Sequence, residues 1–232
     1  MGSHAELKRN LVTACRILDA EGIMDELGHF SVRTPENLVL MNGKISPGQT
    51  TEEDLVLLDL KGDKIEGKIE AAREIPLHLS VYQRRPEVIA VAHTHSPAVV
   101  ALSMAGIKLQ PLDNLSATIY SHEVPLYEEY GLVDTFEMGH RIVDAMGTSG
   151  VVVLKGHGNI VTGTSIEETC ITALWVEKTA RLQYQAMLVG YPQALPAEEI
   201  SRVHQQVSGG KAFERAWNYY RWKVDGDPGR HD

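Results

Sequence analysis

Apolar residues recur along this chain with two different periods, and the longer period marks helices. Near the start, Leu7, Leu11, Cys15 and Leu18 follow one another every three or four residues, which puts them on one face of an amphipathic helix. Short polar residues precede several such stretches, as expected at helix starts, and Asp134 is expected to cap one of them. The helices predicted in this way span residues 5–21, 73–84, 96–104, 134–146, 164–189, 197–206 and 212–223.

Short aliphatic runs between turn residues mark the strands. The run 54–59 turns at Lys61-Gly-Asp63 into a second short run, as a hairpin does, and the apolar run 88–92 is expected to be a buried strand. A further apolar run follows Gly150 and is expected to pair with the run after it. The strands predicted in this way span residues 30–33, 37–41, 54–59, 64–66, 88–92, 151–154 and 159–162.

The alternation of strands and helices predicts a single α/β domain over residues 1–232. We place its core at about residues 5–190 and a helical C-terminal tail at residues 197–223. A chain of 232 residues with 43% hydrophobic residues is sufficient for one large core. No internal repeat, low-complexity stretch or long linker divides the sequence, so one domain is favoured.

Charge and composition exclude several classes of partner. The formal net charge is −9 and no basic stripe is present, so we expect no binding to nucleic acid. No apolar run is long enough for a membrane span, and the first residues do not match a signal peptide. Cys15 and Cys170 each lie among apolar neighbours in helical patterns, which favours buried free thiols over a disulfide framework. We therefore expect a cytoplasmic protein.

Three histidines and one glutamate carry the candidate chemistry of the chain. His93 and His95 are two residues apart, directly after the predicted strand 88–92, so both imidazoles can face one metal ion. His157 lies on a glycine-flanked turn after a later strand, and Glu74 can supply an oxygen ligand or a catalytic carboxylate. Three imidazoles and a carboxylate are typical of a catalytic divalent-metal site. The sequence therefore predicts an enzyme with one divalent ion per subunit, for which Zn, Mn, Co and Fe stay open.

The order of these motifs resembles the class II aldolase/adducin family. The resemblance implies a three-layer α/β/α fold with a central, mostly antiparallel sheet, and a homo-oligomer, often a tetramer, with active sites at subunit interfaces. Such a bound cation polarises a substrate oxygen and stabilises the enolate that forms when a carbon–carbon bond breaks. The motifs that carry the resemblance, over about residues 7–190, are Gly28-His-Phe-Ser-Val-Arg33, Ile45-Ser-Pro-Gly48, Glu74, His93-Thr-His95-Ser96 and Lys155-Gly-His157-Gly158.

The resemblance also assigns roles to individual residues. It implies that His93, His95 and His157 are the metal ligands and that Glu74 acts as the acid or base. The motif that contains Ser46 and Gly48 is expected to contact the substrate, which we take to be a small molecule with a carboxylate.

The chain departs from the sugar-phosphate members of this family where they bind phosphate. Those members have two small hydroxyl residues before the catalytic acid, and this chain has Ala72 and Arg73. The Gly-Asn pair of the family is Gly28-His29 here, so a titratable imidazole replaces an amide. A guanidinium suits a carboxylate as well as a phosphate, so we expect Arg73 to bind substrate and His29 to be a second catalytic group. A solvated charge and a hydrogen-bonded turn residue are the respective alternatives.

For several aromatic and histidine residues the sequence leaves two or more roles open. The tyrosine that some aldolases bring from a neighbouring subunit is missing from the equivalent stretch 110–114. His78 either orients Glu74 one helical turn away or is a structural residue. The aromatic tail 217–222 either closes over a neighbouring site or packs as a helix. The candidate replacements for the missing tyrosine are Tyr120, Tyr127, Tyr130, Tyr219 and Tyr220.

Together these features favour a metal-dependent carbon–carbon lyase that acts on a non-phosphorylated carboxylate. Within that class we expect a decarboxylase of an ortho-dihydroxy aromatic acid, such as a dihydroxyphthalate or a dihydroxybenzoate, in the breakdown of aromatic compounds. A class II retro-aldolase acting on a hydroxy-keto acid or a sugar phosphate is the alternative. An epimerase is disfavoured because the epimerases of the family carry aspartate where Glu74 stands. An adducin-like non-catalytic module is a remote alternative, against which the retained histidines argue.

Overall fold

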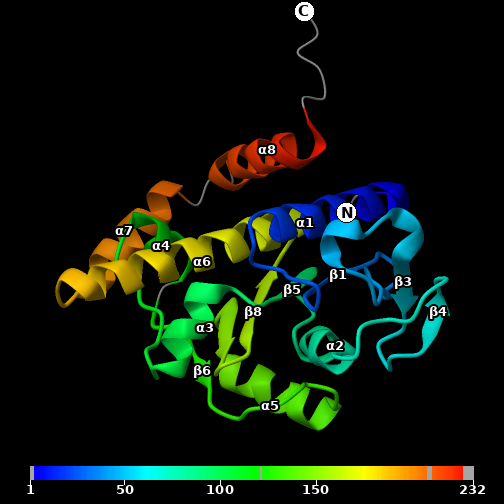
Figure 1. Ribbon diagram of the computed structural model, residues 1–232, viewed down its shortest axis with the longest axis horizontal. Coiled ribbons are helices and arrows are strands. Elements are labelled where there is room, and N and C mark those ends of the chain that lie inside the picture. Colours follow the sequence, from blue (N-terminus) through cyan, green and yellow to red (C-terminus); the bar gives the residue numbers. More distant parts are fainter. Residues whose placement is uncertain (1–2, 121, 208–210, 227–232) are drawn as a thin grey trace, which may run out of the picture.

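An eight-stranded sheet forms the centre of this single domain (Figure 1). The computed structural model describes residues 3–120, 122–207 and 211–226. The strands are β1 (His29–Arg33), β2 (Val39–Asn42), β3 (Leu55–Leu58), β4 (Lys64–Glu66), β5 (Ala90–Thr94), β6 (Leu126–Tyr127), β7 (Val151–Leu154) and β8 (Gly158–Gly163). Their order in the sheet is β4-β3-β2-β1-β5-β8-β7-β6, and neighbours are antiparallel except for the parallel pair β6 and β7.

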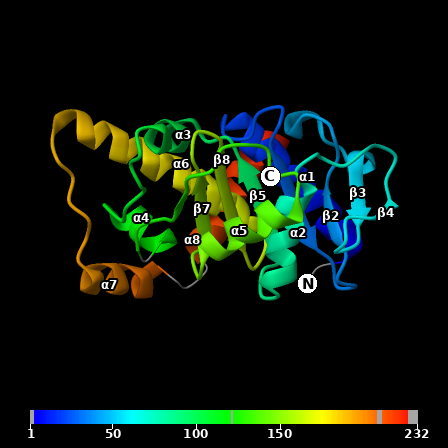
Figure 2. The same ribbon diagram turned by 90° about the horizontal axis from the view of Figure 1, so that it is seen from below.

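Helices cover both faces of the sheet. They are α1 (His4–Ala20), α2 (Ile75–Arg84), α3 (Pro97–Met104), α4 (Asn114–Ile119), α5 (Phe136–Met146), α6 (Ile166–Val189), α7 (Ala197–Val207) and α8 (Lys211–Asp225). Helices α1, α6 and α8 pack together on one face, and α2 and α5 pack together on the other. Seen from below, α2 and α5 lie in front of β5, β7 and β8 (Figure 2). The predicted three-layer α/β/α fold with a mostly antiparallel sheet is confirmed.

The two helical layers bury alternate residues of the same strands. On β7, Val151 and Val153 belong to the core under α1 and α6, whereas Val152 and Leu154 belong to the core under α2 and α5. Residues two apart on a strand share a face, so β7 contributes side chains to both cores. Because both faces are covered, β7 is a continuous apolar run, whereas the equally central β1 alternates polar and apolar residues.

Each helix and strand that the pattern predicted is present, with small shifts at the ends. The helix α4 and the strand β6 were not predicted, because six and two residues are too few to show a period. The division into a core over residues 5–190 and a tail over residues 197–223 stays a prediction. Residues 1, 2, 121, 208–210 and 227–232 of the predicted domain lie outside the described part of the chain.

The prediction that Asp134 caps α5 is wrong. Thr135 is the N-cap, and its hydroxyl accepts a hydrogen bond from the backbone N–H of Met138. The carboxylate of Asp134 is instead paired with Arg73, 2.8 Å from its guanidinium. Both residues have suitable side chains for a cap, so the ion pair across the loop decides which of them is used.

The aromatic part of the C-terminal tail lies on α8, which packs against α1 and α6. Trp217 is 5% exposed and lies in the core with α1 and α6, while Tyr219 and Trp222 are about half exposed. Both cysteines have free, buried thiols, as predicted, and burial raises the pKa of Cys15 to about 12. Among the helices of the described residues, none has the length and apolar character needed to cross a bilayer.

Gly158→Ala is expected to lower Tm by several degrees. A methyl group at Gly158 would collide with the backbone carbonyl of Thr94 on the adjacent strand β5, and overpacking of this kind costs about 1–3 kcal/mol. Gly190→Ala is the matched control, because Gly190 has an extended φ of 175° and no atom within 4 Å of an added methyl. Thermal unfolding followed by circular dichroism tests the pair, and equal loss of Tm in both variants would contradict the packing argument.

Candidate active site

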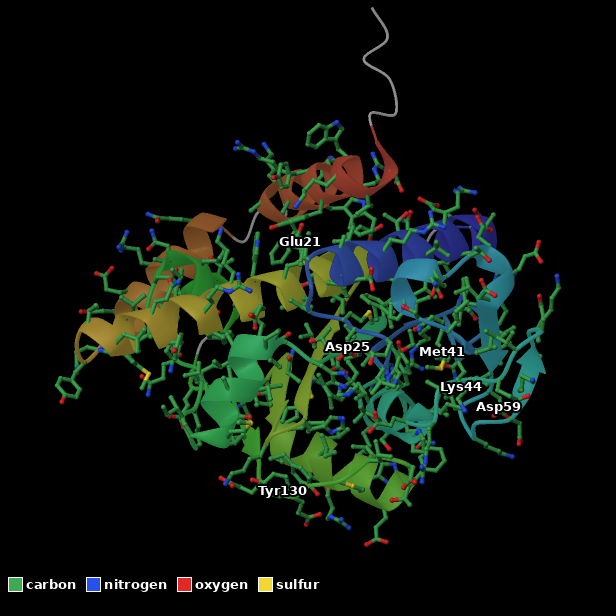
Figure 3. All side chains as sticks on the ribbon, in the orientation of Figure 1. Glu21, Asp25, Met41, Lys44, Asp59 and Tyr130 are labelled. Carbon is green, nitrogen blue, oxygen red and sulfur yellow. The ribbon has the colours of Figure 1, made fainter. Side chains whose placement is uncertain are left out.

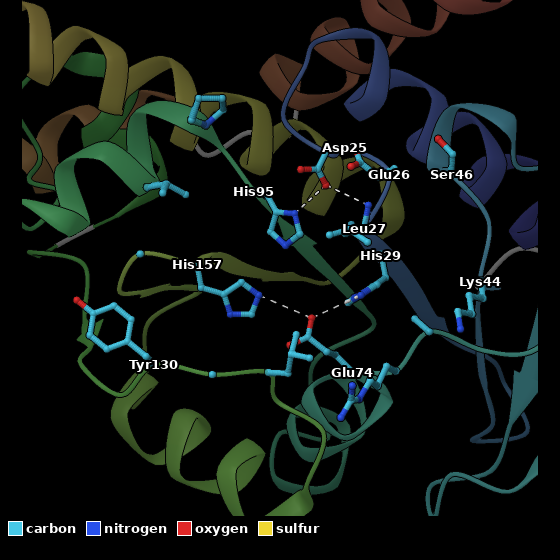
Figure 4. A pocket seen from close by; sticks show the side chains of 18 of the residues that line it. Asp25, Glu26, Leu27, His29, Lys44, Ser46, Glu74, His95, Tyr130 and His157 are labelled. Atoms are coloured by element: carbon cyan, nitrogen blue, oxygen red, sulfur yellow. Dashed lines mark hydrogen bonds and ion pairs between the residues drawn. The ribbon is translucent and has the colours of Figure 1, made fainter.

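Five ionisable side chains meet at one end of the strand pair β1–β5. His29 and His93 stand directly opposite each other in this antiparallel pair, so their rings share a face, with centroids 5.2 Å apart. His95 follows just after β5, and His157 lies on the turn between β7 and β8. Glu74 is the N-cap residue of α2, which brings its carboxylate to the same place (Figure 4).

The ring nitrogens of three histidines converge on one point. The Nε2 atom of His93 lies 3.3 Å from Nε2 of His157 and 3.2 Å from Nε2 of His95. A tetrahedral ion with bonds of about 2.0–2.1 Å to imidazole nitrogens separates those nitrogens by about 3.3–3.4 Å. The spacing of the three histidines therefore fits the coordination sphere of a divalent metal.

Hydrogen bonds on the far side of two rings strengthen this assignment. Nδ1 of His93 lies 3.2 Å from the carbonyl oxygen of Asn159, and Nδ1 of His95 lies 2.7 Å from a carboxylate oxygen of Asp25. Since a carbonyl and a carboxylate can only accept, both Nδ1 atoms donate, and both Nε2 atoms of the neutral rings carry lone pairs. Two lone pairs facing each other at 3.2 Å repel, so a cation between them stabilises the arrangement.

Burial favours the metal-binding form of His93 and His157. Desolvation, followed by the neighbouring histidines His29, His95 and His157, holds the pKa of His93 well below its usual value. Desolvation also lowers the pKa of His157, although the carboxylate of Glu74 opposes this shift. A neutral imidazole is the ligand form, so the site binds a metal without first releasing a proton from these rings.

Glu74 is held with one oxygen toward the histidines. Its Oε1 accepts a hydrogen bond of 2.8 Å from the backbone N–H of Val133. Its Oε2 lies 3.6 Å from His93 Nε2, 3.8 Å from His157 Nε2 and 3.7 Å from His29 Nε2. The side chain is nearly fully buried, yet this free oxygen lies at the wall of a cavity. It is within reach of a metal ion or of a substrate held by that ion.

His29 and His78 form a second imidazole pair beside Glu74. His78 Nε2 lies 3.3 Å from His29 Nδ1, and His78 Nδ1 lies 2.7 Å from the hydroxyl of Ser31. Its ring nitrogens are thus turned toward His29 and Ser31. Desolvation lowers the pKa of His78 to about 3 and, with the neighbouring histidines, holds that of His29 well below its usual value.

A cavity of about 1240 Å³ opens in front of this cluster. It is wider than a typical small-molecule pocket, so a small aromatic acid would fit with room for further contacts. Figure 4 shows Tyr130 beside His157, and Lys44 and Ser46 on the opposite side of Glu74. Apolar side chains complete the wall, among them Val100, Met104 and Leu132.

Two of the three predicted substrate contacts line the cavity, and the third does not. Ser46 and Arg73 line the cavity, although the Arg73 guanidinium is paired with Asp134 and its side chain is 70% exposed. Gly48 is not among the lining residues, and a methyl group there would collide with the carboxylate of Asp19 on α1.

Of the five candidate tyrosines, Tyr130 lines the cavity. The hydroxyl of Tyr120 instead pairs with Thr179, and that of Tyr127 donates to Glu129. Tyr219 and Tyr220 belong to α8, on the face of the sheet away from α2.

Three site residues escaped the sequence analysis. Asp25 lies in the loop after α1 and Lys44 in the loop after β2, and both line the cavity; both are labelled in Figure 3. Val133 contributes only its backbone N–H to Glu74. Lys44 directly precedes the motif Ile45-Ser-Pro-Gly48, but none of the three is part of a motif, and their contacts are with residues far away in the sequence.

Comparison with known proteins places the chain in a family. The model of the class II aldolase and adducin N-terminal domain matches residues 9–184, which is most of the chain. The chain belongs to this family. The resemblance stated from the motifs is therefore confirmed.

Relatives and solved structures agree with the family. A 3,4-dihydroxyphthalate decarboxylase of Terrabacter sp. (strain DBF63) is 36% identical over 86% of this chain and 90% of its own length. A 5-methylthioribulose-1-phosphate/5-deoxyribulose-1-phosphate aldolase of Rhodospirillum rubrum is 26% identical over 87% of this chain and 91% of its own. The crystal structure of an aldolase II superfamily protein from Pseudomonas syringae has the same fold, with a TM-score of 0.84, 23% identity and coverage of 97% and 94% of the two chains. The protein is thus an enzyme of the lyase class.

Asp25→Asn is expected to weaken binding of Zn²⁺ by about 10- to 100-fold, because the charged acceptor behind His95 orients the ring and raises its basicity. Isothermal titration of the metal-free protein measures the affinity. Glu26→Gln removes the same charge from the adjacent residue of the cavity wall and should leave the affinity almost unchanged. Equal affinities of the Asp25 variant and the unmodified protein would contradict the role of Asp25.

Proposed function

We propose that this protein is a metal-dependent decarboxylase of an ortho-dihydroxy aromatic acid, of the dihydroxyphthalate or dihydroxybenzoate kind. The observation that carries the proposal is the convergence of three imidazole nitrogens and one free carboxylate oxygen at the wall of an open cavity. The missing hydroxyl pair at Ala72 and Arg73 argues against a sugar phosphate. The identity of 36% to a 3,4-dihydroxyphthalate decarboxylase supports the same class of substrate.

His93, His95 and His157 would hold one divalent ion, and Glu74 is close enough to act as a fourth ligand in the resting state. When bound, such an ion draws electron density from substrate oxygens and stabilises the charge that develops as CO2 leaves. Imidazole nitrogens suit Zn, Mn, Co and Fe, so the donor set leaves the choice among them open.

Glu74 is the group that moves the proton in this proposal. The bond between the ring carbon and the carboxylate carbon breaks, CO2 leaves, and the electron pair stays on the ring carbon. That carbon must then take a proton. The Glu74 carboxylate accepts this proton on Oε2 from a substrate hydroxyl and passes it to the ring carbon, while Val133 holds Oε1 in place, and the product oxyanion is protonated by water. His29 Nε2 lies 3.7 Å from the same oxygen and is the second catalytic group.

Two cations on the cavity wall would bind a remaining carboxylate of the substrate. Arg73 is one of them, and its pair with Asp134 involves a single guanidinium nitrogen, which leaves other N–H groups for a substrate. Lys44 is the other, and its ammonium group pairs with no carboxylate in the part of the chain that the structure describes. Ser46 adds a hydroxyl on the same wall, while Gly48 shapes the turn behind it.

The assembly is part of the proposal. We expect a cytoplasmic homo-oligomer, with a tetramer favoured, built from single-domain subunits of residues 1–232. Large exposed apolar side chains at the end of α6 and on α8 support association, and they include Leu188, Val189, Tyr191 and Trp222.

A retro-aldolase that uses the same ion is the second candidate. It is favoured by the identity of 26% to a sugar-phosphate aldolase and by Tyr130, which lines the cavity and lies beside His157 in Figure 4. Its products would be an aldehyde and a second carbonyl compound in place of CO2.

Product analysis of the metal-loaded protein separates the two candidates. We expect CO2 from a dihydroxyphthalate or a dihydroxybenzoate and none from hydroxy-keto acids. Glu74→Gln should lower kcat by about 10²- to 10⁴-fold, as expected when an acid–base group is removed. The metal content of this variant, measured by mass spectrometry, controls for loss of the ion. An aldehyde or pyruvate without CO2 would instead establish the retro-aldolase.

Lys44→Met and Arg73→Ala are each expected to raise KM for an aromatic dicarboxylate by about tenfold or more, since a hydrogen bond to a charged group contributes about 1.5–3 kcal/mol. Catechol, which has no carboxylate, serves as the control ligand, and its inhibition constant should not change. Lys178→Met on the exposed side of α6 is the matched variant and should leave both constants unchanged. Unchanged KM in both cavity variants would rule out a carboxylate anchor at this wall.

A further inference from the structure

A row of four polar side chains is buried behind the active site. His29 Nδ1 lies 3.3 Å from His78 Nε2, His78 Nδ1 lies 2.7 Å from the Ser31 hydroxyl, and that hydroxyl lies 2.9 Å from the hydroxyl of Tyr82. None of the four is more than 5% exposed. We call these residues, His29, His78, Ser31 and Tyr82, the buried polar row.

The row forms because a strand and a helix present their residues at matching intervals. His29 and Ser31 are two apart on β1 and therefore share a face. His78 and Tyr82 are four apart on α2 and lie one turn from each other on the same side. The contact between these two faces places one end of the row next to Glu74 and the other end in the core with Leu79 and Val81.

The hydrogen bonds of the buried polar row can run in either of two directions, and the number of protons available decides between them. If Tyr82 donates to Ser31, then Ser31 donates to Nδ1 of His78. The single proton of the neutral His78 ring is then on Nε2 and is donated to Nδ1 of His29. The proton of His29 must therefore be on Nε2, which faces Oε2 of Glu74 at 3.7 Å. In this order Tyr82, Ser31 and His78 each donate a proton to the next member of the row, and the proton of His29 points toward Glu74.

The opposite direction is unfavourable at both ends. Ser31 would donate to Tyr82, and each ring would donate from Nδ1, so the proton of the Tyr82 phenol would have no acceptor among the hydrogen bonds of the described residues. A buried donor without an acceptor loses its hydration without compensation. At the other end, the bare Nε2 of His29 would face the carboxylate of Glu74, and the two would repel each other.

The far end of the row is closed to solvent. Tyr82 is 1% exposed, and the guanidinium of Arg33 lies 4.9 Å above its ring while donating to its backbone carbonyl. Burial raises the pKa of the Tyr82 phenol, so this hydroxyl keeps its proton. The row therefore cannot exchange protons with water at that end, and it acts by fixing positions rather than by conducting protons.

We propose that His78 is a positioning residue which, with Ser31 and Tyr82, fixes His29 in the tautomer that carries its proton on Nε2. His29 then donates a hydrogen bond toward Glu74 or a substrate oxygen, and Glu74 alone transfers the proton to the substrate carbon. The roles of His29 and Glu74 toward the substrate rest on the proposed function, whereas the tautomer of His29 does not depend on any substrate.

The tautomer can be measured without turnover. Protein labelled with ¹⁵N-histidine and loaded with Zn²⁺ is expected to show His29 with a protonated Nε2 and a bare Nδ1 in long-range ¹H–¹⁵N spectra, assigned by comparison with His29→Asn. Ser31→Ala removes the hydroxyl that directs His78 and should produce a mixture of His29 tautomers. A proton on Nδ1 of His29 in the unmodified protein would overturn the proposal, as would an unchanged spectrum of the Ser31 variant.

Kinetics test the consequence for catalysis. His78→Phe removes the donor and is expected to lower kcat by about 10- to 100-fold, as a misplaced catalytic group does, with KM within twofold. His78→Gln retains an N–H near the position of Nε2 and should recover most of kcat. His140→Phe is the control, because His140 pairs with Gln83 away from the cavity and should not affect kcat.

Metal content and Tm are measured for each variant, and kcat is compared only between variants in which both match the unmodified protein, so that loss of folding does not affect the comparison. Equal kcat for the phenylalanine and glutamine variants of His78 would overturn the positioning role. If no carboxylate substrate is turned over by the unmodified protein, the proposed function fails, and the spectra of His29 still decide the tautomer.

Discussion

The antiparallel pairing of β1 with β5 is the constraint on which the candidate active site depends. It sets His29 opposite His93 and turns both rings toward α2. Because side chains alternate along a strand, a shift of one residue would turn His93 into the opposite core and separate it from His157. The same pairing holds Ser31 where His78 can reach it. Strand register, which the apolar residues of both cores fix, thereby determines the chemistry at the end of the strands.

The buried polar groups of the site are tolerated because each has a hydrogen-bond partner. His93 is fully buried, and Glu74 and His29 are nearly so. Each has a fixed partner on its far side, namely the carbonyl of Asn159, the N–H of Val133 and the ring of His78. What stays unsatisfied points to a single place in front of the cavity. A buried polar cluster that is satisfied except at one point is suited to bind an ion there.

The sequence was informative where chemistry is local and silent where it depends on contacts between distant segments. The spacing of His93 and His95 and the turn at His157 could be recognised, because neighbouring residues define them. The bond from Asp25 to His95 joins residues 70 apart, and the pair of Arg73 with Asp134 joins residues 61 apart. In the same pair, Asp134 binds Arg73 and does not form the predicted cap of α5. For the same reason His78 could be linked by spacing to Glu74, while its contact with His29 depended on the packing of α2 on β1.

The charges around the cavity bear on which carboxylate of the substrate can leave as CO2. A carboxylate that leaves as CO2 must lose its negative charge, so a cation bound to that carboxylate would oppose the step by stabilising the ground state. Lys44 comes from the loop after β2 and Arg73 from the segment before α2, and Figure 4 shows Lys44 on the opposite side of Glu74 from His157. A substrate with two carboxylates can use the cations for the group it keeps and place the group it loses near Glu74. Within the proposed function, this arrangement suits an aromatic diacid better than a simple monoacid.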